Sequence, residues 1–508
     1  MKNIFLTFSI FLTMVLAANN KKPNILFILT DDQSHRTVSC YDEAHDWVKT
    51  PHIDSLAKTG MRFTNAYIGT WCMPARATLL TGKLQYNMDS LKMAGEYPGS
   101  SYNPKVLPYF PKTFKEQGYV TGMVGKWHTG VDTGAKRDWD YQAVWNRPRH
   151  IKNAGHYYYD QLIEFNGEEA KMVKGYSTDN YTKWAGEFIE NKKLHDNKPW
   201  YLWVCYSGVH GPFTPADRHM KQFPNAKVEI PEDIYPPRAG KPTYSSNRAK
   251  WVEKDDMPHM TSKFSMRTVQ SNGGIHGNTL HDWVRQYQQA VSSLDDGVGR
   301  LIQKLKDTGQ YENTLIIFTS DQGLAWGQHG FNHKLAPYDA TIKSPMIISM
   351  ANKIKAETVC KAPVNGTDIV PTIFDYAGLK LPWRMDGRSI KPLLKNHKAK
   401  WDYPLLMAFT GQVYGSETDK IPTDETISNT AGIPWWLSVV SGRYKYIQTL
   451  IAGETAELYD LENDPKELHN LAHKAEYKET VAKMKALMIS ELKRTDCGFA
   501  NKLPKVKE

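Results

Sequence analysis

Four short apolar runs constrain the fold of this chain most strongly, because each one is followed by polar residues. The runs are NILFILT (24–30), YVTGMVG (119–125), WYLWVCYSGV (200–209) and TLIIFTS (314–320). Continuous apolar runs of this length, separated by helical patterns, are typical of buried parallel strands. An open α/β sheet binds its ligands beyond the carboxyl ends of its strands. The sequence therefore predicts an α/β fold with a functional site at that edge of the sheet.

Oxygen ligands follow the first and the last of these runs. They are the carboxylates of Asp31, Asp32 and Asp321 and the side-chain amide of Gln322. Such hard ligands suit Ca²⁺ or Mg²⁺ rather than zinc, which binds His and Cys. Adjacent Asp residues often only cap helices or end strands, but a second acidic strand end favours a metal site.

Basic residues follow the two middle runs. They are Lys126, His128 and His210, and Lys334 comes after the fourth run. Alone, each would more often be an ordinary core or surface residue. Beside a divalent cation, however, lysine, histidine and arginine suit a tetrahedral oxyanion such as sulfate or phosphate.

The intervals between the runs predict helices and a less regular region. Helical patterns cover residues 52–60, 111–118, 177–193 and 281–309, and Asn166-Gly167 predicts a hairpin with a two-residue turn. Residues 211–277 are rich in Pro, Gly and polar residues and predict a lid or substrate wall without clear elements. After residue 395 a strand pair and a helix near 476–494 predict a smaller α+β subdomain.

The N-terminus predicts an exported protein. Residues 1–18 combine Lys2, an apolar run and small residues at Ala17-Ala18, the pattern of a secretory signal peptide. That run is too short to span a membrane, and no later one is long enough. The formal net charge of +10 suits an anionic substrate, and the scattered basic residues form no nucleic-acid-binding motif. The short leader favours a periplasmic or secreted bacterial protein; in a eukaryote the lysosome is the alternative.

Export makes the five cysteines informative, because an odd number leaves at least one unpaired in an oxidising compartment. Cys205 lies in an apolar run and is predicted to be buried. Pairing of Cys40, Cys360 and Cys497 stays open. Only Cys72 has chemically suggestive surroundings, in the segment TWCMPARATLLTG (70–82).

The pattern Cys-x-Pro-x-Arg followed by ATLLTG resembles the signature of the type I sulfatases, in the alkaline-phosphatase-like superfamily. In that family the cysteine is oxidised after translation to formylglycine by a formylglycine-generating or sulfatase-maturating enzyme. The resemblance extends from Asp31-Asp32-Gln33 through TSDQG (319–323) to ELYDLENDPKELHNLA (457–472). It implies an alkaline-phosphatase-like sandwich with a mostly parallel sheet at 22–395 and a smaller C-terminal subdomain at 396–508.

The resemblance also implies roles for the residues at the strand ends. Asp31, Asp32, Asp321 and Gln322 match the ligands of one calcium ion, which the formylglycine from Cys72 faces. Arg76 matches the residue that holds formylglycine. Lys126 and His128 match the pair beside the nucleophile, and His210 and Lys334 the pair that contacts the sulfate and the leaving oxygen.

Formylglycine chemistry explains why a cysteine is needed. The hydrated aldehyde has two hydroxyls: one attacks sulfur, and the other later loses its proton and expels sulfate, which regenerates the aldehyde. Calcium, Arg76 and the lysines stabilise the sulfuryl charge. A protonated His210 is the first candidate for donating to the leaving alcohol, with Lys334 second.

Export, charge and a surplus of aromatic residues predict a sulfated carbohydrate substrate, a polysaccharide or its oligosaccharides. The alternatives are a phosphodiesterase or phosphonate monoester hydrolase on the same fold, a non-catalytic glycan-binding protein, and a thiol protein in which Cys72 stays a cysteine. His35-Arg36 and Trp127 are either pocket-lining or structural.

Overall fold

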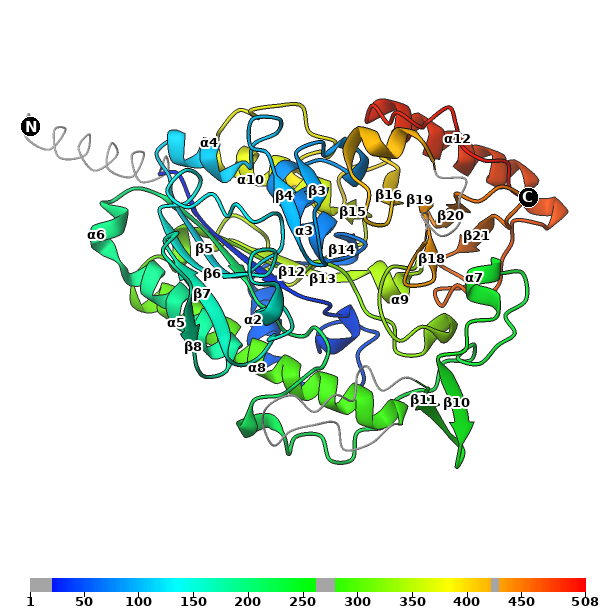
Figure 1. The fold of residues 1–508 in the computed structure, drawn as a ribbon, viewed down its shortest axis with the longest axis horizontal. Helices are drawn as coiled ribbons and strands as arrows, with labels where there is room; N and C mark the ends of the chain where they lie inside the picture. Colours follow the sequence, from blue (N-terminus) through cyan, green and yellow to red (C-terminus); the bar gives the residue numbers. More distant parts are fainter. Residues whose placement is uncertain (1–20, 262–278, 422–428) are drawn as a thin grey trace, which may run out of the picture.

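The computed structural model describes residues 21–261, 279–421 and 429–508. The predicted signal peptide therefore lies outside the described residues. The centre of the molecule is an eleven-stranded mixed sheet (Figure 1). The four apolar runs form its adjacent middle strands, which are β12 (Thr314–Ser320), β1 (Asn24–Thr30), β9 (Trp200–Cys205) and β5 (Val120–Trp127). All three pairings among them are parallel, which confirms the predicted parallel core.

Mostly antiparallel strands extend the sheet on both sides. Next to β5 lie β6 (Tyr141–Asn146, parallel to β5), β7 (Gln161–Phe165) and β8 (Lys171–Val173). Next to β12 lie β13 (Ser344–Ser349) and β2 (Met61–Tyr67), and β2 also pairs with β14 (Thr358–Cys360) and β15 (Val364–Asn365).

The loop that connects the hairpin strands β7 and β8 is longer than predicted. Asn166 and Gly167 both have positive φ, as the turn requires, but five residues separate the two strands instead of two. Asn166 continues to bond with β6, because it exchanges hydrogen bonds with Gln142. Pairing with β8 therefore starts only further along the chain.

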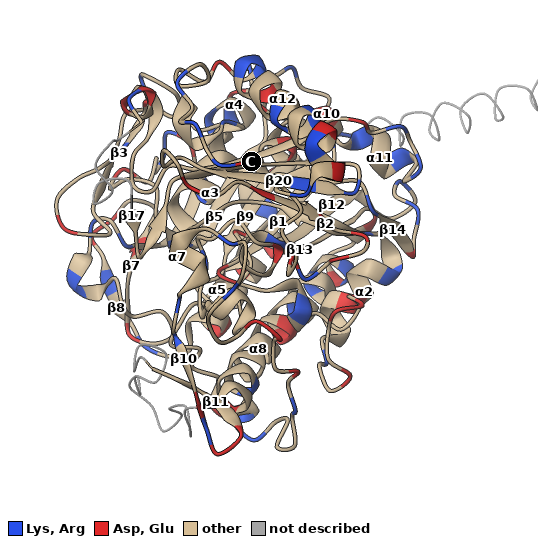
Figure 2. Cartoon of the chain, turned by 90° about the vertical axis from the view of Figure 1, so that its right-hand side faces the viewer, with Lys and Arg blue, Asp and Glu red and all other residues tan. Residues whose placement is uncertain are grey.

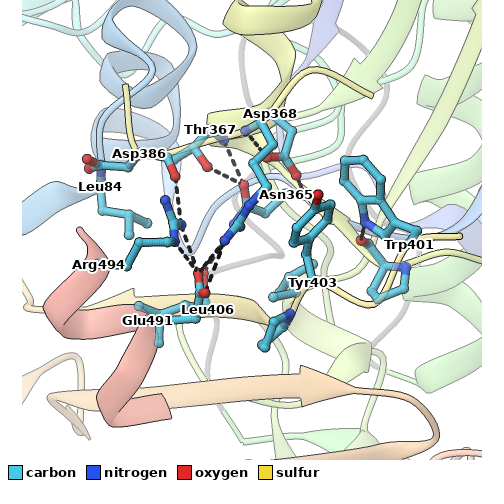
Figure 3. A pocket seen from close by; sticks show the side chains of 14 residues that line it. Leu84, Asn365, Thr367, Asp368, Asp386, Trp401, Tyr403, Leu406, Glu491 and Arg494 are labelled. Atoms are coloured by element: carbon cyan, nitrogen blue, oxygen red, sulfur yellow. Dashed lines mark hydrogen bonds and ion pairs between the residues drawn. The ribbon is translucent and has the colours of Figure 1, made fainter. Parts of the chain in front are cut away.

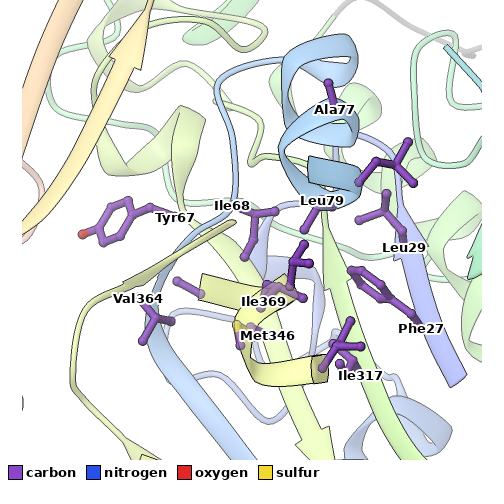
Figure 4. Packing of buried hydrophobic residues seen from close by; sticks show 14 of the residues in the cluster. Phe27, Leu29, Tyr67, Ile68, Ala77, Leu79, Ile317, Met346, Val364 and Ile369 are labelled. Carbon is purple, nitrogen blue, oxygen red and sulfur yellow. The ribbon is translucent and has the colours of Figure 1, made fainter. Parts of the chain in front are cut away.

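Helices cover both faces of the sheet. One face carries α2 (Pro51–Thr59), α5 (Ser177–Glu190) and α8 (Leu280–Asp307), and the other carries α3 (Cys72–Thr81), α4 (Pro111–Glu116) and α10 (Ile369–Ala377). Successive β1 side chains point to opposite faces. Leu26 and Ile28 pack under the first set of helices. Phe27 and Leu29 pack under the second set, and Figure 4 shows them on β1 beside Ala77 and Leu79 of α3.

The C-terminal part is a smaller α+β subdomain, as predicted. Its four-stranded antiparallel sheet contains β16 (Leu405–Phe409), β19 (Trp436–Ser441), β20 (Tyr444–Thr449) and β21 (Glu457–Asp460), and α12 (Lys478–Arg494) packs on it. Beside a small pocket, Arg388 contacts Glu491 of α12, and Arg494 of the same helix donates to the Asp386 carbonyl. These contacts connect α12 to the larger part of the chain, and Figure 3 shows Glu491 and Arg494 near Asp386. The boundary at 395, just after α11 (Lys391–Lys395), stays a prediction.

The described part of the long irregular segment is more ordered than predicted. It contains α7 (Thr243–Ser246) and a hairpin of β10 (Trp251–Lys254) and β11 (Met257–Met260). Trp251 and Met260 are buried with the core that includes α8, while Asp255 and Asp256 take positive φ at the turn. Residues 262–278 of this segment lie outside the described residues.

Short elements complete the described parts of the chain. The strands are β3 (Leu91–Met93), β4 (Ser100–Tyr102), β17 (Asn429–Thr430) and β18 (Ile433–Pro434), and the helices are α6 (Lys192–His195) and α9 (Asp339–Ile342). All five cysteines are described and none is in a disulfide, and Cys205 is buried as predicted. In the described ranges, no helix has the length and apolar character needed to cross a bilayer. Basic and acidic residues are interspersed over the surface helices (Figure 2).

Candidate active site

Cys72 is the first residue of α3, and the helix places it at the carboxyl edge of the central strands. Trp71 occupies the N-cap in an extended conformation, and Gly82 ends the helix in the left-handed region, at φ 69°. The Cys72 side chain is buried, with Sγ 3.2 Å from Asp31 Oδ1 and 3.9 Å from Asp32 Oδ1. Burial and the neighbouring Asp31 charge raise the pKa of the Cys72 thiol to about 11.

The predicted oxygen ligands meet here because β1 and β12 are adjacent and in register. Asp31 and Asp32 follow Thr30, which pairs with Ser320, and Asp321 follows Ser320. Oδ1 of Asp321 accepts a hydrogen bond from the backbone N–H of Asp32 at 3.0 Å. Burial and the charge of Asp31 raise the pKa of Asp321 to about 7, although Arg76 opposes this. These groups therefore form a crowded acidic cluster.

A hard divalent cation fits this cluster. Single ligand atoms from Asp31, Asp32 and Cys72 all lie within 4.8 Å of one another. The Gln322 amide nitrogen contacts Asp32 Oδ1 and lies 3.7 Å from Cys72 Sγ, while its oxygen is buried without a hydrogen-bond partner. Amide oxygen and nitrogen are interchangeable by rotation, so a turned amide would direct oxygen toward Asp32. The donor set is then oxygen-rich, as Ca²⁺ requires.

Three cationic side chains surround the acidic cluster. The Lys126 ammonium contacts Asp31, and Arg76 lies 3.1 Å from Asp321 and 3.6 Å from Asp31. Burial opposes ionisation of Asp31, but Lys126 and Arg76 hold its pKa well below the usual range. Lys334 Nζ lies 2.6 Å from Asp32 Oδ1 and 2.9 Å from Cys72 Sγ. Burial lowers the pKa of Lys334, but Asp32 outweighs it and the pKa lies well above normal.

The two predicted histidines occupy different surroundings. His210 Nε2 lies 3.7 Å from Asp32 Oδ2 and 3.1 Å from the hydroxyl of Tyr157, whose ring stacks on the imidazole. His128 is buried against Arg147. Burial lowers the pKa of both rings well below normal, and a nearby cation adds to this: Lys334 for His210, and Arg147 for His128. The surroundings of both rings therefore favour the neutral imidazole.

Two residues of this site, Arg147 and Tyr157, were not predicted from the sequence. Arg147 directly follows β6, which pairs in parallel with β5, so it leaves the sheet beside His128. The run YQAVWN before Arg147 is a fifth strand ending in a basic residue, and this signal could have revealed it. Tyr157 lies in a loop, and only its contact with His210 identifies it.

The sequence left open whether Trp127 and His35-Arg36 line the pocket or are structural. In the fold, Trp127 is structural and the other two residues lie away from the site. Trp127 is buried and donates through Nε1 to the Gly130 carbonyl at 2.7 Å. Arg36 packs over the Trp326 ring at 4.3 Å, and His35 lies 3.2 Å from the Lys343 carbonyl. His35 and Arg36 both line a cavity of about 330 Å³ that is separate from the site around Cys72.

Comparison with known proteins agrees with this architecture. The family model described as "Sulfatase" matches residues 23–379, and "N-sulphoglucosamine sulphohydrolase, C-terminal" matches residues 327–494. An N-acetylglucosamine-6-O-sulfatase of Bacteroides thetaiotaomicron is 28% identical and covers 96% of this chain and 88% of its own. The human N-acetylglucosamine-6-sulfatase is 27% identical over 78% of this chain and 69% of its own.

A solved structure shares the whole fold. It shows a protein in complex with its substrate D-glucosamine-2-N,6-O-disulfate, with a TM-score of 0.78, 25% identity and coverage of 94% of this chain and 98% of that one. The fold class is thus the predicted alkaline-phosphatase-like sandwich, and the enzyme class is that of sulfuric ester hydrolases. The chain belongs to the sulfatase family.

Proposed function

We propose that this protein hydrolyses sulfate esters of a sulfated carbohydrate, with a formylglycine derived from Cys72 and one calcium ion. One observation carries the proposal: Asp31, Asp32 and Lys334 converge on the sulfur of Cys72 within one buried cluster. The names of the two relatives and the disulfated amino sugar of the solved complex support an amino-sugar 6-sulfate as the ester that is hydrolysed.

The chain's own residues would hold both groups. Formylglycine at position 72 would supply a nucleophile that can be regenerated, and calcium bound by Asp31, Asp32, Asp321 and Gln322 would supply a Lewis acid. Arg76 donates to Asp321 and to the carbonyl of Lys126, so it fixes the wall of the site. Lys126 and Lys334 are placed to stabilise negative charge on the sulfuryl oxygens.

The contacts favour Lys334 over His210 as the proton donor to the leaving alcohol. His210 Nδ1 lies 2.8 Å from the Gly211 carbonyl, so this nitrogen carries the proton and Nε2 accepts from Tyr157. A neutral imidazole in this tautomer has no proton to give at Nε2. Lys334 is protonated and lies against Cys72 Sγ. We therefore place Lys334 ahead of His210, a choice that the sequence left open.

Export and maturation belong to the same proposal. The predicted signal peptide directs the chain to the periplasm or outside the cell, where sulfated polysaccharides occur. Cys72 is only 1% exposed, so the maturating enzyme has to act before α3 packs into the fold. A sulfated glycan and that enzyme are the two partners we propose.

Two measurements on protein from its native host test the proposal. Mass analysis of the peptide spanning residues 64–83 should show an aldehyde in place of the Cys72 thiol. Sulfate release from N-acetylglucosamine 6-sulfate should depend on added calcium and stop with a chelator. An unmodified thiol together with no activity on any sulfate ester would refute the proposal. Faster hydrolysis of matched phosphate diesters or phosphonates would favour the alternative hydrolase.

A further inference from the structure

The guanidinium of Arg147 is a buried cation that has no carboxylate partner among the described residues. Its side chain is only 4% exposed. Its hydrogen bonds go to the Ala154 carbonyl at 2.9 Å, toward His128 and to the side chain of Tyr97, and its charge lies over the rings of Trp145 and Tyr157 at 5.4 and 5.0 Å. Within residues 21–261, 279–421 and 429–508, no ion pair involves it. By contrast, Arg76 of the same site contacts two carboxylates.

A buried and uncompensated arginine is costly unless a ligand provides the counter-charge. Aromatic faces and carbonyl groups attract the cation but do not neutralise it. The planar guanidinium matches the oxygens of a carboxylate, sulfate or phosphate in a two-point contact. The surroundings of Arg147 therefore indicate an oxyanion that the folded chain itself does not supply.

The position of Arg147 places this oxyanion beside the reaction centre and not on it. Asn146 pairs with Trp127, and the Arg147 N–H donates to the Trp127 carbonyl at 3.2 Å, so Arg147 and His128 leave the sheet side by side. Cys72 Sγ is contacted by Asp31, Asp32, Gln322 and Lys334. Among the described contacts of the sulfur, the cation is therefore Lys334 and not Arg147.

His128 and Tyr97 lie on the side of Arg147 that faces the protein surface. The terminal nitrogen of Arg147 lies 3.2 Å from Nδ1 and 3.1 Å from Nε2 of His128, so it lies across the ring and not in line with one lone pair. The ring of Tyr97 lies 6.0 Å from His128 and is 47% exposed. Arg147 therefore stands between the buried centre and an exposed aromatic side chain.

We propose that Arg147 binds a second oxyanion of the substrate, a sulfate or carboxylate on the same sugar as the scissile ester or on the adjoining sugar. This inference rests on the proposed function and deepens it. It makes Arg147 a specificity-determining residue for glycans with two neighbouring anionic groups. It also predicts that a sugar with a single sulfate is a poorer substrate.

The test compares kcat/KM on three compounds. They are N-acetylglucosamine 6-sulfate, D-glucosamine-2-N,6-O-disulfate, and a disaccharide that joins a uronic acid to N-acetylglucosamine 6-sulfate. We expect the wild-type enzyme to prefer one of the doubly anionic compounds by about 10- to 100-fold, and Arg147→Gln to abolish that preference. The compound whose advantage is lost identifies sulfate or carboxylate as the ligand.

Arg149→Gln is the matched control. Arg149 lies two residues along the same loop with a side chain that is 51% exposed, so this variant should keep the wild-type preference. Arg147→Lys keeps the charge without the planar fork and should show an intermediate preference, which maintains the test if Arg147→Gln does not fold.

Three outcomes would count against the inference. Equal losses on all three compounds in Arg147→Gln, or a wild-type enzyme without any preference, would overturn the role of Arg147 and leave the sulfatase proposal intact. A wild-type enzyme with formylglycine that releases sulfate from none of the compounds would overturn the proposed glycan substrate and this inference with it.

Discussion

The reaction centre and the junction between the two sheets both bury lysines among carboxylates, but they use them differently. The junction cluster consists of Lys241, Lys445, Asp339, Glu457 and Glu467 and lies where α9 meets the C-terminal sheet (Figure 1). Lys445 lies 2.8 Å from both Asp339 and Glu467, and Lys241 donates to Tyr459 and to the Glu467 carbonyl at 2.8 and 2.7 Å. Each junction lysine is held by several acceptors from the chain.

The centre leaves groups without such partners. Among the described residues, the oxygen of Gln322 has no hydrogen-bond partner and Arg147 has no carboxylate partner, although Lys334 is paired with Asp32. The junction also has an oxygen without a hydrogen bond, Glu457 Oε1, but both of its lysines are paired with carboxylates of the chain. Paired lysines stabilise the fold, whereas an unpaired arginine in the centre is available to a ligand. Substitutions in the two clusters should therefore separate stability from activity.

The largest expected effect is that of Cys72→Ala on the centre. Removal of the nucleophile should lower sulfate release at least about a thousand-fold, because the remaining residues can bind but not form the covalent intermediate. The thermal midpoint should stay close to that of the wild type. Cys497→Ala, a buried cysteine in the C-terminal subdomain, should keep near wild-type activity. Substantial turnover by Cys72→Ala would show that another group is the nucleophile.

Lys445→Met tests the junction. It leaves the buried Glu467 and the half-buried Asp339 without their shared cation, so the free energy of unfolding should fall by about 3–5 kcal/mol. Activity per folded molecule should remain at a permissive temperature. Denaturant unfolding and sulfate release measure the two quantities.

The counterpart in the centre is Lys126→Met, which should lose about a hundredfold or more in activity. Lys92→Met, which removes only an exposed pair with Glu417, should change neither the activity nor the stability.

A folded Lys445→Met variant that has lost its activity would contradict the expected separation of the two clusters.

Calcium should stabilise the centre and leave the junction unaffected. A cation that binds only the native cluster stabilises it by about 2.7 kcal/mol at a free concentration a hundred times its Kd. A chelator should therefore lower the thermal midpoint of the wild type. Asp32→Asn should abolish this response, and Asp339→Asn, although destabilised, should keep it. A calcium response that survives in Asp32→Asn would argue against the proposed ligand set.

The smallest effect concerns the pH dependence of the junction. Burial raises the pKa of Glu467 to about 7, although Lys445 opposes the shift. A folded-state pKa above the unfolded value means that the native state binds the extra proton. The stability from this group is then full below about pH 4.5 and is lost as the pH rises toward 7. Glu467→Gln should flatten the slope of unfolding free energy between pH 5 and 7. An unchanged slope would show that Glu467 does not titrate in this range.

Prediction from sequence succeeded where local pattern and position carry the information. The apolar runs before Asp31, Lys126, His210 and Asp321 showed that these residues leave strands at one edge of a sheet. The prediction was incomplete where residues that meet in space come from different strands. The run before Arg147 indicates the end of a fifth strand, but only the pairing of β6 with β5 places this residue beside His128. The loop of the hairpin at Asn166 was predicted too short, because the hydrogen bonds of Asn166 to β6 depend on the order of the strands.

The sequence by itself determined which chemical groups are available: a cysteine in a Cys-x-Pro-x-Arg pattern, oxygen ligands after two strands and basic residues after the others. Only the tertiary structure decided their partners. It set His128 against Arg147 and His210 against Tyr157, and it left the Gln322 oxygen and the Arg147 charge unsatisfied. The physical reason is that local sequence determines how a strand ends, whereas strand order and register determine which side chains meet across the sheet.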